Sequence, residues 1–164
     1  METVTLGENP RSEMRQRRSD IALLVLRVMI GVVFIAHGAQ KLFGAFGGSG
    51  LDKTAGAMAG LGLEPGMFFA VLGGLTEFGG GLLLLVGLCT PLAGLAVTAV
   101  MVLAIALSTG ANGFISMSAL GYEYNLVLIA IALALVIAGP GRFSLDHRLG
   151  LRRMVTGRTR AASA

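Results

Sequence analysis

Residues 21–44 of the chain read IALLVLRVMIGVVFIAHGAQKLFG, and this stretch is the strongest structural signal in the sequence. It begins as a long apolar run, interrupted only by Arg27, and gathers His37, Gln40 and Lys41 near its end. A hydrophobic run of this length predicts a helix that spans a membrane. Ionisable side chains inside such a helix are costly in lipid, so they indicate a functional face.

The polar side chains of this predicted helix fall on one side of it. Residues three or four positions apart lie above one another on a helix. One stripe of residues with this spacing consists of Arg27, Gly31, Phe34, Gly38 and Lys41. His37 borders this stripe, so the helix is expected to have one side with polar residues and glycines and one apolar side.

The composition excludes several classes of protein. Hydrophobic residues make up 54% of the 164 residues and charged residues 13%, with a mean hydropathy of +0.78, which excludes an ordinary soluble domain. The net charge of +4 comes from basic residues outside the apolar runs, which indicates topology and lipid contacts and not nucleic-acid binding. The single cysteine, Cys89, excludes a dithiol mechanism within the chain.

The sequence also lacks the motifs of common cofactors. There is no Cys/His spacing typical of zinc and no glycine-rich nucleotide loop, and we assign no metal ligand. A pair of haem ligands is not credible, because the second histidine, His147, follows the last predicted span.

Hydropathy predicts an all-α fold with four spans, at about residues 21–43, 67–88, 92–107 and 121–138. The strictly apolar part of the fourth, from Leu126 to Ala138, is shorter than the roughly 17–25 residues that a bilayer needs, so this helix must start near Gly121 to cross. The connector 45–66 is expected to be a short interfacial helix or an ordered glycine-rich loop.

Charge predicts the orientation of this bundle. The excess of arginine at both ends places both termini in the cytoplasm and the two long connectors outside, in a bacterial plasma membrane. We therefore divide the chain into a polar cytoplasmic segment (1–20), a membrane domain (21–141) and a basic cytoplasmic tail (142–164). The flanking arginines are Arg11, Arg15, Arg17 and Arg18 before the first span, and Arg142, Arg148, Arg152, Arg153, Arg158 and Arg160 after the last.

Glu77 is the charged residue of the second predicted span and lies near the middle of the bilayer. Gly73, Gly80 and Gly81 surround it at helical spacing, which predicts a face where a neighbouring helix approaches closely. An isolated glutamate at this depth is costly unless it is paired or neutral. We expect it either to pair with Arg27 or His37, or to stay protonated and donate to a ligand.

Together the polar residues predict a pocket that opens outward. Each has a plainer interpretation: Arg27 could extend to the head groups, Lys41 could anchor the helix at the interface, and His37 could join two helices. Glu123 and Asn125 could cap the fourth helix. We assign no catalytic residue, and the pocket candidates are Arg27, His37, Gln40, Lys41, Glu77, Glu123 and Asn125.

The order and spacing of several short elements resemble the DoxX family of small bacterial membrane proteins. The resemblance covers roughly residues 21–146 and implies a four-helix membrane bundle. The elements are HG-x-QK-x-FG at 37–44, G-x-x-E-x-x-GG at 74–81, the turn 87–91, Glu123 with Leu126, and GPGRFSLD at 139–146.

The resemblance also implies a link to redox physiology, because relatives are associated with thiosulfate:quinone oxidoreductase and with resistance to oxidants or quinones. Three functions follow as alternatives. The pocket binds a quinone-like or thiol-related molecule, as in a membrane subunit of an oxidoreductase; or the bundle is a scaffold that holds soluble or membrane redox enzymes at its cytoplasmic face; or the polar residues form a proton or solute pathway. The lipid bilayer is an expected partner in all three alternatives, and a homo-oligomer is a further alternative.

Overall fold

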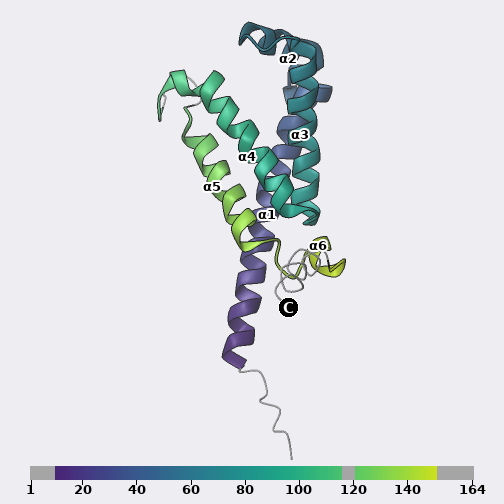
Figure 1. The fold of residues 1–164 in the computed structure, drawn as a ribbon, viewed down its shortest axis with the longest axis vertical. Coiled ribbons are helices and arrows are strands. Elements are labelled where there is room, and N and C mark those ends of the chain that lie inside the picture. Colours follow the sequence, from purple (N-terminus) through teal and green to yellow (C-terminus); the bar gives the residue numbers. More distant parts are fainter. Residues whose placement is uncertain (1–9, 116–120, 151–164) are drawn as a thin grey trace, which may run out of the picture.

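The computed structural model describes residues 10–115 and 121–150, and every regular element in this part of the chain is a helix (Figure 1). Residues 1–9, 116–120 and 151–164 lie outside it, and with them four arginines of the predicted basic tail. In chain order the elements are α1 (Pro10–Phe43), the 3₁₀ turn η1 (Ala45–Gly47), α2 (Gly50–Gly60), α3 (Gly66–Val86), α4 (Thr90–Leu107), the 3₁₀ turn η2 (Thr109–Asn112), α5 (Glu123–Ala138) and α6 (Leu145–Arg148).

The four predicted spans correspond to α1, α3, α4 and α5. Three of these helices, α1, α3 and α4, are long and apolar enough to cross a membrane. The fourth, α5, is apolar but has only 16 residues, because it begins at Glu123 and not at Gly121. The all-α prediction is confirmed, and the connector 45–66 contains the helix α2.

The first helix begins earlier than predicted. It starts at Pro10, a residue suited to the first turn because it lacks an N–H, with Glu13 close to the positive end of the helix. Its 34 residues extend over about 50 Å, well beyond a hydrocarbon core of about 30 Å. The N-terminal part of α1 therefore protrudes past the other helices as an exposed extension, residues 10–19 (Figure 1).

The predicted stripe on α1 is buried, and it packs against α3. Arg27, Gly31, Phe34 and Gly38 all lie inside. A Cβ atom on Gly38 would lie 2.4 Å from the backbone nitrogen of Phe78. Such contacts leave no room for a side chain, so glycine allows the two backbones to approach closely.

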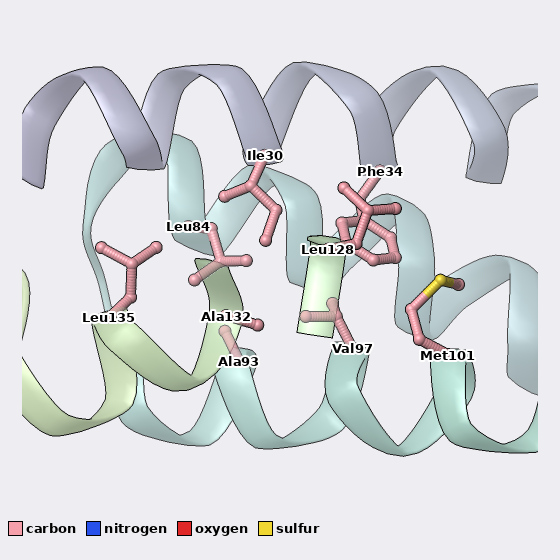
Figure 2. Close-up of a cluster of buried hydrophobic side chains, with 9 residues drawn as sticks. All are labelled: Ile30, Phe34, Leu84, Ala93, Val97, Met101, Leu128, Ala132 and Leu135. Atoms are coloured by element: carbon pink, nitrogen blue, oxygen red, sulfur yellow. The ribbon is translucent and has the colours of Figure 1, made fainter. Parts of the chain in front are cut away.

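The helices α4 and α5 form a second pair, which meets the first pair around an apolar core. Gly94 of α4 allows close contact with Val136 of α5. Figure 1 shows the two pairs close together near the turn between α3 and α4 and diverging toward α2. We call these two regions the termini end and the α2 end. The core consists of Ile30, Phe34, Leu84, Ala93, Val97, Met101, Leu128, Ala132 and Leu135 (Figure 2).

Candidate functional site

A buried ion pair joins the first and third helices in their half toward the α2 end. Lys41 lies in the last turn of α1 and Glu77 in the middle of α3. The Lys41 Nζ atom donates to Glu77 Oε1 at 2.5 Å. The side chain of Glu77 is 1% exposed, whereas that of Lys41 is 32% exposed. The pair is therefore sealed on the carboxylate side and open on the ammonium side.

The close approach of the two helices places this pair. Gly38 lies one turn before Lys41, and its contact with the backbone of Phe78 brings the end of α1 beside the middle of α3. Lys41, one turn after Gly38 on α1, then reaches the carboxylate of Glu77, which is the residue before Phe78. The prediction that Glu77 pairs with Arg27 or His37 is thus wrong, because Lys41 is nearer and on the contacting face.

The second carboxylate oxygen of Glu77 has unmet hydrogen-bonding capacity. Oε2 is buried and has no hydrogen-bond partner among the residues that the structure describes. An ionised carboxylate accepts through both oxygens, and a buried acceptor without a donor costs about 1–3 kcal/mol. Such a group in a folded protein calls for an explanation, for which a ligand or a water molecule is the usual one.

The glycines around Glu77 differ from the prediction at one position. Gly80 and Gly81 pack closely, with a Cβ on Gly80 only 2.9 Å from Val97 Cγ1 of α4. Gly73 was predicted to pack in the same way, but nothing lies within 4 Å of the position that its Cβ would occupy. The two helix pairs diverge toward the α2 end (Figure 1), and Gly73 lies in the half of α3 that is nearer to this end.

Two other predicted residues of α1 lie near the pair in sequence but have partners of their own. His37 is exposed, and its ring centroid lies 6.3 Å from that of Tyr124 in α5. Gln40 Nε2 lies 3.5 Å from the carbonyl oxygen of Phe46 in η1. His37 therefore borders α5, and Gln40 holds the turn that follows α1.

Asn125 and Glu123 lie at the start of α5. Asn125 is buried; its Oδ1 accepts from Thr109 Oγ1 at 3.3 Å and its Nδ2 donates to Met101 Sδ at 3.4 Å. Glu123 begins the helix, and its buried Oε2 has no partner within the described ranges. Asn125 thus joins α5 to α4 and does not cap its own helix.

Arg27 belongs to a different cluster, at the termini end. It is 1% exposed, and its Nη1 and Nη2 atoms donate to the carbonyl oxygens of Pro140 at 2.8 Å and Phe143 at 2.7 Å. Arg27 therefore neither pairs with Glu77 nor extends into the head groups. It holds the GPGRFSLD stretch that leaves α5 against the bundle.

Two aspartates that sequence reasoning missed complete this cluster. Asp146 accepts from the backbone N–H of Cys89 at 2.8 Å and of Thr90 at 3.0 Å, which satisfies the first turn of α4. Asp20 accepts from the backbone N–H of Arg142 at 3.0 Å. We call Arg27, Asp20 and Asp146 the clamp. Its partners are more than 50 positions away in sequence, so no local pattern could have found them.

The cavities at the termini end flank this clamp. Their volumes are about 220 and 410 Å³, and Asp20 and Arg142 line both. Neither Lys41 nor Glu77 lines them. No group of three or more His, Cys, Asp or Glu side chains in the described part of the chain could hold a metal ion.

The helices and the buried ion pair define a small integral membrane protein of bundled helices. The sequence profile of the DoxX family matches residues 22–110, and the chain belongs to this family. It is 31% identical over 147 residues to Uncharacterized membrane protein Rv3486 of Mycobacterium tuberculosis, covering 83% of this chain and 86% of that protein. It is 34% identical over 134 residues to Inner membrane protein YqjF of Escherichia coli, covering 82% of this chain and 96% of that protein. No solved structure matches the chain significantly.

Proposed function

We propose that the protein binds a small quinone-like molecule in the membrane, at the Lys41–Glu77 pair, as a component of redox or oxidant-stress physiology. With both termini in the cytoplasm, as the arginine distribution predicts, this site lies in the outer half of the bilayer. The ring of the molecule would occupy the space beside Gly73, and its oxygen atoms would meet the two charged groups.

One observation carries this proposal. The buried Glu77 carboxylate accepts a hydrogen bond from Lys41 through Oε1, whereas Oε2 has no donor among the described residues. A ligand hydroxyl would supply that donor. The ammonium group of Lys41 has three donors, of which the ion pair uses one, so it can also donate to a ligand oxygen.

The chemistry of the pair favours oxygen ligands over thiols. A hydroquinone hydroxyl both donates and accepts, so it fits between a carboxylate and an ammonium group. A thiol is a weak donor and a weak acceptor, and it would leave much of the hydrogen-bonding capacity of Glu77 unused. The association of DoxX relatives with quinones and oxidants, implied by the resemblance, agrees with this choice.

The test combines identification with function. The protein is extracted gently in native lipid particles, and the bound small molecules are identified by mass spectrometry. A strain that lacks the gene is complemented with the wild type or with Glu77→Gln and exposed to quinone or peroxide. We expect a quinone to co-purify with the wild type and Glu77→Gln to fail in complementation at normal protein levels. A stable, fully complementing Glu77→Gln protein would refute the proposal.

The exposed extension of α1 favours a second candidate function, a scaffold for soluble redox enzymes. Residues 10–19 of this helix are exposed and carry Arg11, Arg15, Arg17 and Arg18, so they offer a basic surface to a partner. Its test is a variant with Arg15→Gln and Arg18→Gln. Under the scaffold hypothesis these changes release partner enzymes from the membrane and leave quinone binding intact, and unchanged partner retention counts against it.

A further inference from the structure

The position of Gly73 on α3 is unusual, because it lies on the buried face of the helix but lacks a neighbour. Glu77, one turn later, and Gly80, two turns later, are both buried on this face. Gly80 is in contact with Val97 of α4, whereas the space beside Gly73 is open for at least 4 Å. A face that is closed at Gly80 and open at Gly73 marks the level at which α4 leaves α3.

The buried carboxylate of Glu77 lies next to this open space along α3. Glu77 follows Gly73 by one helical turn, and its Oε2 atom is the buried acceptor that has no donor in the described part of the chain. Lys41, on the other side of the carboxylate, keeps a third of its side chain exposed. The open space beside Gly73 therefore lies one helical turn from a buried carboxylate whose Oε2 lacks a donor among the described residues and whose counter-charge on Lys41 is partly exposed.

Exposed apolar side chains lie on α3 and α4 in the half of the bundle that contains Gly73. Leu72 on α3 and Leu103 on α4 are exposed, as side chains that face lipid are. The helix α2 packs against α3 and α1 at the α2 end, with Gly66 of α3 allowing contact with the backbone of Ala55. These apolar side chains favour approach by a molecule dissolved in the bilayer over approach by a molecule dissolved in water.

We infer that the Lys41–Glu77 pair is reached sideways from the bilayer, between α3 and α4 at Gly73, by a lipid-borne molecule whose hydroxyl-bearing head binds the pair. The inference rests on the proposed function for the existence of a ligand, and it adds the route and the class: an apolar tail that stays in lipid and a small head that donates to Glu77. The absence of a side chain at Gly73 keeps this route open.

The chain offers a matched pair of variants for the test, Gly73→Leu and Gly79→Leu. Nothing lies within 4 Å of a Cβ at either glycine, so both leucines extend into open space and both variants should fold. Only Gly73 shares the face of Glu77, whereas Gly79 lies on the opposite side of α3. Gly73→Leu thus fills the opening, and Gly79→Leu is its control.

The probe is dicyclohexylcarbodiimide, a lipid-soluble reagent that activates carboxyl groups, used on the full chain in lipid nanodiscs. An activated Glu77 either rearranges to an N-acylurea or forms an amide with Lys41, and peptide mass spectrometry detects both products. We expect labelling of Glu77 in the wild type and in Gly79→Leu, and labelling slower by about tenfold or more in Gly73→Leu, as an added barrier of about 1.4 kcal/mol would give. A water-soluble carbodiimide should label Glu77 poorly in all three.

Other outcomes overturn the inference. Equal labelling of Gly73→Leu and Gly79→Leu, or no labelling of the wild type, would exclude this route, and faster labelling by the water-soluble reagent would show access from the aqueous side. The probe does not depend on the natural ligand. Lipid-side labelling without quinone binding would therefore refute the proposed ligand and keep the route, whereas quinone binding that Gly73→Leu leaves unchanged would refute the route alone.

Discussion

The clamp at the termini end and the ion pair toward the α2 end both rest on a buried charged side chain, but their partners differ in kind. Arg27 and Glu77 are each 1% exposed. Arg27 donates to two backbone carbonyls of the segment after α5, whereas Glu77 is bonded to one side chain that is itself partly exposed. Backbone partners are fixed by the fold, but a lysine side chain can move and share its donors with another molecule.

This difference distinguishes a buried charged side chain that stabilises the fold, Arg27, from one that is able to bind a ligand, Glu77. Removing a partner from a buried charge is strongly destabilising when nothing replaces it. The clamp cannot be opened without detaching the chain that follows α5. The ion pair can be opened from its exposed side, and one of its acceptors is already without a partner in the described structure. We therefore expect mutations at the two ends to separate stability from ligand binding.

The largest effect on stability is expected from Arg27→Gln. Hydrogen bonds from a charged group contribute about 1.5–3 kcal/mol each, and the variant leaves two carbonyls without the guanidinium, so we expect a loss of about 3 kcal/mol. The measurement is thermal unfolding in nanodiscs. Arg18→Gln, on the exposed extension of α1, is the control and should unfold as the wild type does. A loss no greater than that of the control would show that the clamp is not structural.

The next largest effect on stability is expected from a substitution at Gly38, and Gly73 is the glycine with which it is compared. Gly38→Ala pushes a methyl group into the backbone at Phe78 and should cost about 1–3 kcal/mol. Gly73→Ala enters open space and should stay within about 0.5 kcal/mol of the wild type. Chemical denaturation of both variants in the same detergent compares them. An equal loss at the two positions would contradict the open space beside Gly73.

A smaller effect is expected from Asp146→Ala. The carboxylate accepts from two N–H groups of the first turn of α4, and removing such a cap costs about 0.5–2 kcal/mol. Asp52→Ala, at the exposed first turn of α2, is the control, because its carboxylate makes no comparable pair of bonds. Should the two variants unfold at the same temperature, the assignment of Asp146 as a cap would be wrong.

The smallest effect is expected from Cys89→Ser. The backbone N–H of Cys89 is bonded to Asp146, but its thiol is exposed, so the change should stay within about 0.5 kcal/mol. The variant should also complement the deletion strain fully. Loss of oxidant resistance in a strain that still makes the protein would restore a thiol mechanism that involves a partner.

The sequence predicted the helices well and the contacts between them poorly. Apolar runs located α1, α3, α4 and α5, because length and hydropathy are local properties. The start of α1 at Pro10 was missed, since a polar helix outside a membrane carries no hydropathy signal. The stripe on α1 correctly identified a buried face, but helical periodicity does not give the position of a neighbouring helix.

The candidate site shows the same limit. Lys41 and Glu77 were both recognised from their depth and charge. Their pairing, however, depends on the position of α1 along the length of α3, and the Gly38–Phe78 contact fixes this position. Gly73 and Gly80 are equivalent in sequence, and only the divergence of α4 distinguishes them. Arg27 was expected in the pocket as a candidate partner of Glu77, but its own partners come from a distant segment.

The most direct test of the account is the binding of decylubiquinol to three forms of the protein in nanodiscs: the wild type, Glu77→Gln and Asp146→Ala. Asp146→Ala, with an expected loss of about 0.5–2 kcal/mol, is the control for a general loss of stability. We expect Asp146→Ala to bind as the wild type does and Glu77→Gln to bind at least about tenfold more weakly, the equivalent of about 1.4 kcal/mol. Equal affinity in all three forms, or an equal loss in both variants, would contradict the assignment of ligand binding to the Lys41–Glu77 pair.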